Sequence, residues 1–328
     1  MARWTCSHRA SCPSPSGSRF GVTPGGPPSG VTMRTWDAEV HVTALDEPGR
    51  TARLMWTHFE PVHAVTYFHP RARAATEVVG LRGYWRGYFA GRAAPLGAVE
   101  AAPVIAAFFS FAPPMVSRAL PAVWRLATPQ ESLRARLTGA VQALAELTYE
   151  LPEGHLAEAA DLLERAASAA QTPGRVLGAA NAALPVGEYP LARLWQAATT
   201  LRELRGDGHN AALVAAGLDP VETLAWRVAV DMSAENLLGR GWSEEQWRAA
   251  RERLTQRGWL TVDGTATDVG RAGFQAVEDA TDLAAEHPWR VLGPDDTNRL
   301  RELLEPIARS CHTVIPPNSP IMLPALPG

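Results

Sequence analysis

The sequence predicts a mainly α-helical protein, with an N-terminal helical domain followed by a smaller C-terminal domain that carries one β-hairpin. Three observations support this fold class. Helix-capping signals recur along the chain, residues 155–184 are rich in alanine, and an Asp-Gly pair at 263–264 separates two short strand-like runs. Alanine is the strongest helix former, and Asp-Gly between strand-like runs is a strong hairpin signal.

Capping signals locate helices in the N-terminal domain, which is expected over residues 36–190. The run TPQE at 128–131 supplies a capping side chain, a first-turn proline and a reciprocal carboxylate, and Pro152 ends that helix. Thr172 opens another helix, which stops before Pro185. Alanine-rich helices approach one another closely, so we expect a compact helical domain.

Residues 191–290 have the order of elements that is typical of a winged helix-turn-helix domain. Helix follows helix until the Asp-Gly turn, and a further helix follows that turn. The expected elements are a helix over 191–204, helices capped at 219–222 and 243–246, a hairpin wing turning at 263–264, and a separate C-terminal helix over 291–311.

Both ends of the chain are expected to be disordered tails. Residues 1–35 are rich in Ser, Pro and Gly and carry four arginines without apolar periodicity, and residues 312–328 contain five prolines. We hypothesise that the natural start is Met33 rather than Met1. The cysteines, Cys6, Cys12 and Cys311, fall in or beside these tails, so no disulfide or metal site is expected from them.

Composition and charge exclude several classes of function. The 31 basic residues are all arginine, which excludes Schiff-base chemistry and a P-loop lysine. A net charge of −3 gives no general attraction to nucleic acid or anionic lipid. The apolar run 101–112 is shorter than the roughly 20 residues of a membrane span. We expect a cytoplasmic protein with no membrane partner and no cofactor.

Glu60, His63 and Tyr67 recur at spacings of three and four residues, which places them on one face of a helix. We interpret them as part of a ligand site, in which Glu60 fixes one imidazole nitrogen of His63 and leaves the other free. The alternative is a core histidine satisfied within a Glu-His-Tyr hydrogen-bond network. His58 and His69 invite a metal hypothesis, but their spacing does not favour it, and no metal site is expected.

Residues 81–93, if helical, form rows at a spacing of four, and one row is Gly83, Gly87 and Gly91. Each interior glycine costs roughly 1 kcal/mol relative to alanine, so we expect this row to be buried against a backbone or a ligand. The alternative is that the glycines break the segment into turns.

Arginine and aromatic residues alternate in the same region, because residues 71–92 carry five arginines against one glutamate. We expect the arginines to clamp a carboxylate or phosphate and the aromatic rings to stack on a planar group. His63 and either Arg82 or Arg86 should then converge on one hollow. The alternative is a solvated arginine face. The expected ligand residues here are Arg82, Tyr84, Trp85, Arg86, Tyr88 and Arg92.

Residues 205–209, RGDGH, are expected to form a tight turn between the domains, because two glycines permit positive φ. Asp207 would cap a helix that begins near His209. We include Asp207 and His209 as a second, smaller set of ligand residues at the domain junction.

Three blocks of the chain resemble the actinobacterial SalK-like helix-turn-helix family, over roughly residues 51–310. They are EPVHAVTYF at 60–68, GLRGYWRGYFAGR at 80–92, and RGDGH at 205–209. The resemblance implies a winged-helix portion and does not imply a shared reaction.

DNA contact by the winged helix is one of two alternatives, and the other is a packing or dimerisation module. Residues 190–290 hold 11 arginines against 15 acidic residues, a net charge of −4, whereas phosphate neutralisation supplies much of the affinity for DNA. If DNA binds, Arg240, Arg248 and Arg251 are the expected contacts.

The sequence therefore predicts a ligand-responsive, regulator-like winged-helix protein that binds a small organic anion or aromatic metabolite in its N-terminal domain. The competing hypothesis is an enzyme of specialised metabolism. In that case His63 is the general acid or base, Glu60 orients it, and Tyr67 belongs to the same catalytic set. Arg82 or Arg86 holds the anionic substrate, and the winged helix is a packing or dimerisation module.

Overall fold

The computed structural model describes residues 49–316 and residue 319, and the described chain is mainly helical. The expected tail over 1–35, the Met33 hypothesis, Cys6, Cys12 and most of the expected tail over 312–328 lie outside the described residues. The helices are α1 (Arg50–Phe68), α2 (Pro70–Val78), α3 (Tyr84–Ala93), η1 (Ala94–Leu96), α4 (Ala101–Phe108), α5 (Pro113–Ala119), η2 (Ala122–Arg125), α6 (Pro129–Leu147), α7 (Glu153–Ser168), α8 (Val176–Ala182), α9 (Pro190–Ala215), α10 (Pro220–Val230), α11 (Glu235–Leu238), α12 (Glu244–Gln256), α13 (Asp268–Ala284), α14 (His287–Leu292) and α15 (Pro294–His312).

Three helices begin where the capping signals predicted. At α6 the Thr128 side chain accepts a hydrogen bond from the backbone N–H of Glu131, whose carboxylate accepts one from the backbone N–H of Thr128. The same reciprocal arrangement starts α10 and α12. Each box satisfies backbone donors that a helix start otherwise leaves unpaired.

The prediction of a β-hairpin wing was wrong. Between residues 49 and 316 no strand forms, and residues 259–267 make a turn with one isolated antiparallel bridge, between Leu260 and Ala266. Thr267, one residue further, is the N-cap of α13 and accepts a hydrogen bond from the backbone N–H of Gly270 at 3.0 Å. The backbone N–H of Thr261 donates to the carbonyl of Thr265, and that of Thr267 to the carbonyl of Trp259, on either side of this bridge, and α13 begins directly after it.

The expected turn at residues 205–209 was also wrong, because α9 continues through it as one helix of 26 residues. Gly208 allows a close approach instead: a Cβ there would lie 3.0 Å from Nη1 of Arg175 and 3.2 Å from Cβ of Ala284. Asp207 does cap a helix, but a different one. Its carboxylate accepts hydrogen bonds from the backbone N–H groups of Leu177 and Gly178 at the start of α8, both at 2.9 Å.

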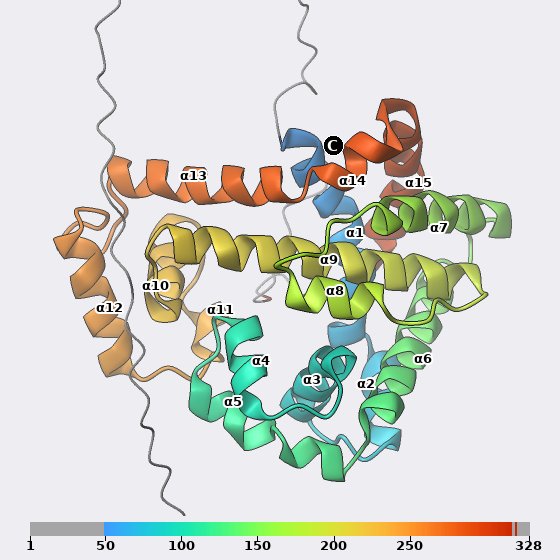
Figure 1. Ribbon diagram of the computed structural model, residues 1–328, viewed down its shortest axis with the longest axis horizontal. Coiled ribbons are helices and arrows are strands. Elements are labelled where there is room, and N and C mark those ends of the chain that lie inside the picture. The colour runs from blue at the N-terminus through green and yellow to red at the C-terminus, as the bar shows by residue number, and fades with distance from the viewer. Residues whose placement is uncertain (1–48, 317–318, 320–328) are drawn as a thin grey trace, which may run out of the picture. The chain divides into compact units, whose positions relative to one another are not determined.

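Helix α9 links the cores of the described chain. It packs against α1, α6, α7 and α8 and lies beside α13 (Figure 1). Leu194 and Trp195 join the apolar core between α1, α6, α7 and α15, whereas Leu213 joins a second core around Trp226 and Trp247 in α10 and α12. A third apolar cluster joins α3, α4 and α5. The expected domain boundary near residue 190 stays a prediction.

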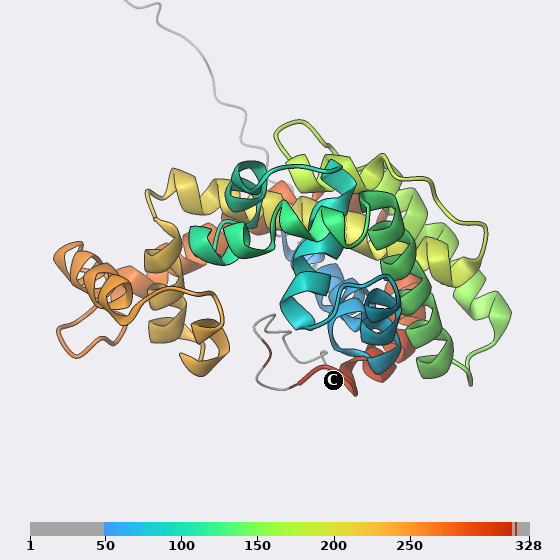
Figure 2. The same ribbon diagram turned by 90° about the horizontal axis from the view of Figure 1, so that it is seen from below.

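Helices α12 and α7 lie at opposite ends of the described part of the molecule (Figure 2).

Near the C-terminal end of the sequence, Cys311 of α15 is completely buried, so this cysteine belongs to the core and not to a tail. Within residues 49–316, no helix is both long enough and apolar enough to cross a bilayer.

Candidate functional site

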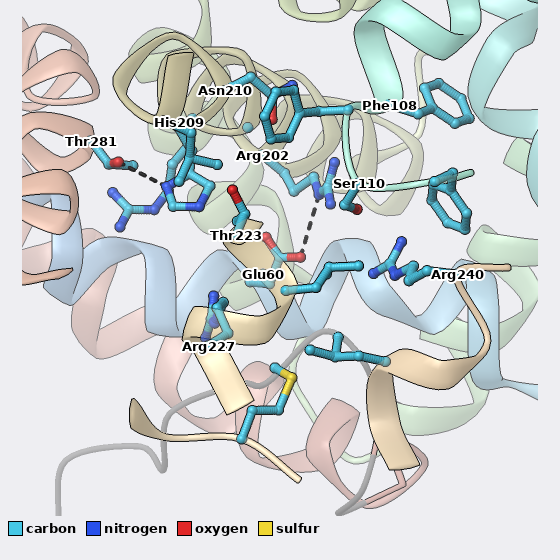
Figure 3. Close-up of a pocket in the computed structure, with 18 of the residues that line it drawn as sticks. Glu60, Phe108, Ser110, Arg202, His209, Asn210, Thr223, Arg227, Arg240 and Thr281 are labelled. Carbon is cyan, nitrogen blue, oxygen red and sulfur yellow. Dashed lines mark hydrogen bonds and ion pairs between the residues drawn. The ribbon is translucent and has the colours of Figure 1, made fainter. Parts of the chain in front are cut away.

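A cavity of about 470 Å³ lies where the N-terminal helices meet α9, α10 and α13 (Figure 3). This volume is typical of small-molecule sites. Side chains of α1, α3 and α9 form part of its wall. The rest comes from residues 108–111, from α10 and the two residues after it, from α11 and α13, and from Arg240 in the turn between α11 and α12.

Seven of the predicted ligand residues line this cavity. They come from three segments that are far apart in the sequence, and the fold brings them together. They are Glu60, Tyr67, Tyr84, Trp85, Tyr88, Arg92 and His209.

Arg82 and Arg86 do not converge with His63 on this hollow, and that expectation was wrong. Both arginines are exposed and are not among the described residues that line the cavity. Helix α3 begins only at Tyr84, after Gly83 at a φ of 87°, so Arg82 precedes the helix. Arg86 lies two positions from Tyr84, and a separation of two puts it on a different face of the helix.

His63 is a buried core histidine. Its Nδ1 lies 3.0 Å from the Thr199 hydroxyl, its Nε2 lies 3.1 Å from the Tyr67 hydroxyl, and its ring stacks on Trp195. Burial lowers the pKa of His63 well below its usual value, and the nearby Arg202 lowers it further. This matches the alternative of a satisfied core histidine, with Thr199 in the place expected for Glu60.

Glu60 instead belongs to a network of buried charges at the cavity wall. Its carboxylate accepts a hydrogen bond from Nε1 of Trp56 at 3.0 Å and lies 3.5 Å from Nε of Arg202. Burial raises the pKa of Glu60, and Arg202 and Trp56 offset part of that rise. Arg202 also binds Glu203 at 2.8 Å, so one guanidinium connects the two carboxylates.

Tyr88 lies among the positive charges of this network. Its hydroxyl accepts a hydrogen bond from Nη1 of Arg92 at 3.1 Å. Burial by itself raises the pKa of the phenol, but Arg92, Arg240 and Arg202 outweigh burial, and the pKa is lowered overall.

His209 lies at the other end of the cavity, on the same helix as Arg202. Its Nδ1 is 2.9 Å from the Thr281 hydroxyl of α13 (Figure 3). Burial lowers the pKa of His209 to about 4, with Glu278 opposing the shift and nearby arginines adding to it. The imidazole is therefore neutral at pH 7 and can donate or accept one hydrogen bond toward a ligand.

Several cavity residues were not predicted from the sequence. Two of them are Arg202 and Arg205. Together with His209, which was predicted, they are spaced by three and four along α9, so the three would have been recognised as one face if residues 205–209 had been assigned to a helix. Arg53 and Arg227 come from distant segments and carry no local signal. All of these side chains line the cavity.

Arg240 was expected to contact DNA, but it lies in the cavity wall. Its guanidinium lies over the ring of Phe111, 4.2 Å from the ring centroid, and its buried Nε has no hydrogen-bond partner among the described residues. Its backbone carbonyl accepts a hydrogen bond from the backbone N–H of Ala112 at 2.9 Å. The side chain of Arg240 therefore faces the cavity.

Arg248 and Arg251, the other two expected DNA contacts, are exposed on α12. Arg248 forms an i,i+4 ion pair with Glu252 at 3.0 Å. Both arginines line a separate surface hollow together with Glu244 and Glu245.

Asp207 does not line the cavity described here, because its carboxylate is used in capping α8. Among the described residues, no group of three His, Cys, Asp or Glu side chains is placed to hold a metal ion.

A family model described as a helix-turn-helix family matches residues 52–315 of the chain. No curated protein and no solved structure matches the chain significantly.

Proposed function

Because the chain belongs to a helix-turn-helix family, we propose that it is a DNA-binding protein that responds to a small organic anion or aromatic metabolite held in the cavity. The resemblance of three sequence blocks to actinobacterial SalK-like proteins supports the same assignment. A homodimer is part of this proposal, since helix-turn-helix proteins commonly bind two half-sites as dimers. We also propose a cytoplasmic location.

Helix α12 is the proposed recognition helix. Trp247, Ala250 and Leu254 face the core of the helix-turn-helix part, which leaves Arg248 and Arg251 on the outer surface. Glu244 and Glu245 lie in its first turn, where they interact favourably with the helix dipole but would repel phosphates. The part of α12 beyond its first turn, which carries Arg248 and Arg251, is therefore the part that we expect to approach DNA.

Ligand control is proposed from one observation: Arg240 is both a cavity residue and part of the turn that joins α11 to α12. Arg240 lies three positions before Ser243, the N-cap of α12. The same turn is held against the 108–111 loop, where Nε1 of Trp242 donates a hydrogen bond to the carbonyl of Ser110 at 2.9 Å. A ligand that moves Arg240 acts directly on the start of the recognition helix.

The enzyme alternative gains no support from the site. A general base must be able to reach a substrate proton, but His63 is fully buried and both of its ring nitrogens are hydrogen-bonded. The arginines that were expected to hold a substrate beside it, Arg82 and Arg86, are on the surface.

A gel-shift experiment at low salt tests DNA binding. Labelled genomic fragments of the host are mixed with the wild-type chain and with the double variant Arg248→Gln/Arg251→Gln. We expect the wild type to retain a subset of fragments and the variant to lose them. The binding that remains in the variant should depend less steeply on salt than that of the wild type, by about two phosphate contacts.

The matched control is Arg165→Gln/Arg299→Gln, which removes two exposed arginines of α7 and α15 and changes the net charge equally. It should retain the same fragments as the wild type. Absence of retention by the wild type, or equal loss in both double variants, would exclude α12 as a specific DNA-contacting helix.

A further inference from the structure

The arginines of the cavity differ in whether a carboxylate of the protein pairs with them. Five of them have such partners. Arg53 pairs with Asp282 and Glu278, Arg92 with Glu203, Arg202 with Glu203 and Glu60, Arg205 with Asp282, and Arg227 with Asp231.

Arg240 is the exception, since no carboxylate of the described residues pairs with it. Its guanidinium interacts with the phenol of Tyr88, through charge and a side-chain hydrogen bond, and with the phenol of Tyr84, while its Nε is buried without a hydrogen-bond partner. Burial lowers the pKa of Arg240, although a guanidinium keeps its proton under protein conditions. Arg240 is half-buried, and a charge withdrawn from water without a carboxylate beside it is costly, so this end of the cavity favours an anionic group from outside the chain.

The wall around Arg240 is aromatic. Phe111 lies beneath its guanidinium, and the ring centroid of Phe111 is 5.5 Å from that of Tyr88 and 5.8 Å from that of Trp85. Phe108 and Tyr88 meet edge to face at 6.2 Å. Rings at these distances and tilts form a surface on which a planar group of a ligand can stack or pack edge-on.

The 108–111 segment, which carries Phe108 and Phe111, is conformationally strained. Phe109, between Phe108 and Ser110, has a φ of 41°, in the left-handed region that non-glycine residues rarely adopt. Its ring lines the cavity, as do Phe108 and Phe111. Strained backbone of this kind tends to occur where side chains are held for binding.

The number of cavity arginines without a carboxylate partner limits the negative charge that a ligand can carry. A phosphate dianion is usually held by several donors or by an arginine cluster, whereas a carboxylate is matched by one guanidinium. Only Arg240 lacks a carboxylate among the six cavity arginines that the structure describes. A single negative charge is therefore the better match.

We propose that the cavity binds an aromatic carboxylate, with its carboxylate on Arg240 and its ring against Trp85, Tyr88, Phe108 and Phe111. This inference rests on the proposed function, because it names the chemical class of the ligand. The far end of the cavity, with His209, Asn210, Thr223 and Thr281, supplies hydrogen-bonding groups for a neutral substituent.

Direct binding to the full chain without DNA tests the proposal. Benzoate, 2-naphthoate and indole-3-acetate are each titrated into the protein beside the corresponding neutral amide, by isothermal calorimetry at pH 7. We expect at least one acid to bind, and to bind at least tenfold more tightly than its amide. Arg240→Met should lower the affinity for that acid at least tenfold and lower the affinity for the amide by a smaller factor.

Arg86→Met is the control, because it removes an exposed arginine of α3 outside the cavity and should leave the affinity for the acid unchanged. The comparison of acid with amide on the wild type decides the proposal even if Arg240→Met fails to fold. The proposal is overturned if none of the three acids binds, if acid and amide bind equally, or if 2-naphthyl phosphate binds as tightly as 2-naphthoate. DNA is absent, so a negative gel-shift result leaves this test intact, and failure here leaves DNA binding untouched.

Discussion

Arg92 of α3 and Glu203 of α9 form a two-pronged ion pair inside the protein, with Nε to Oε1 and Nη2 to Oε2 both at 2.9 Å. Fewer than a tenth of either side chain is exposed. Glu203 also accepts a hydrogen bond from Arg202, so one carboxylate holds two arginines at the cavity wall. The two guanidiniums keep the pKa of Glu203 far below its usual range.

Replacing Glu203 with glutamine should destabilise the fold strongly. The change leaves two buried guanidiniums without their carboxylate, and breaking a buried pair in this way costs about 3–5 kcal/mol. The free energy of unfolding, measured by urea titration, should fall by that amount relative to the wild type.

The surface pair Arg299–Glu158 is the control for this prediction. It has similar geometry, at 2.7 Å, but both side chains are about half exposed. Glu158→Gln should cost no more than about 1 kcal/mol, as for other exposed pairs. Equal effects of the two substitutions would mean that the interior does not amplify the Arg92–Glu203 interaction.

Stability should fall as the pH is lowered from about 6.5 to about 4, in part through His209. Its pKa is about 4 in the folded protein and 6.5 as an unperturbed histidine, so the unfolded chain binds more protons in this window. The free energy of unfolding then rises with pH, by up to about 1.4 kcal/mol per pH unit for one fully shifted group. His209→Asn, which keeps a donor near Nδ1, should give a shallower slope in urea titrations across this range. Equal slopes would show that folding does not lower the pKa of His209.

The ionisation of Tyr88 should depend on Arg240. Arg92, Arg240 and Arg202 lower the pKa of this phenol, so Arg240→Met should raise it by removing one of these charges. Ultraviolet absorbance of the phenolate reports the titration, and a Tyr88→Phe variant identifies the contribution of this residue. The exposed Arg86→Met should leave the titration unchanged. An unshifted pKa in Arg240→Met would place Arg240 away from Tyr88.

Helices α2 and α6 cross at Gly139, where an added side chain should not fit. A Cβ at this position would lie 2.6 Å from the Cα of Ala72 and 3.0 Å from the Cβ of Ala75. Gly139→Ala should therefore lower the stability by about 1–3 kcal/mol, as overpacking does, despite the better helix propensity of alanine. Gly154→Ala in α7 is the control, because nothing lies within 4 Å of its Cβ position, and thermal unfolding should show it unchanged or slightly stabilised.

The features that could be predicted from the sequence are those set by local chemistry. The caps at Thr128 and Ser243 depend on side chains three residues away, so they are visible in the sequence and were confirmed. The hairpin expected at Asp263–Gly264 was wrong, because the residues around this turn form only one isolated bridge before Thr267 caps α13. Gly208 was misassigned to a turn because its requirement, close packing against Arg175 and Ala284, comes from distant parts of the chain.

In the candidate site, too, the features set by local sequence could be predicted and those set by distant contacts could not. Tyr84, Trp85, Tyr88 and Arg92 share one helix, and their pattern was recognised from the sequence. The placement of Arg240 beside them depends on how the turn between α11 and α12 docks on the 108–111 loop, and no sequence spacing encodes that contact.

Native mass spectrometry of the chain purified from its host tests most directly the claim that this cavity holds a ligand. We predict that the wild type and Arg86→Met each carry one small organic acid, which Arg240→Met lacks. A wild-type mass equal to that of the bare chain, or an adduct that Arg240→Met retains in full, would contradict the assignment of this cavity as the ligand site.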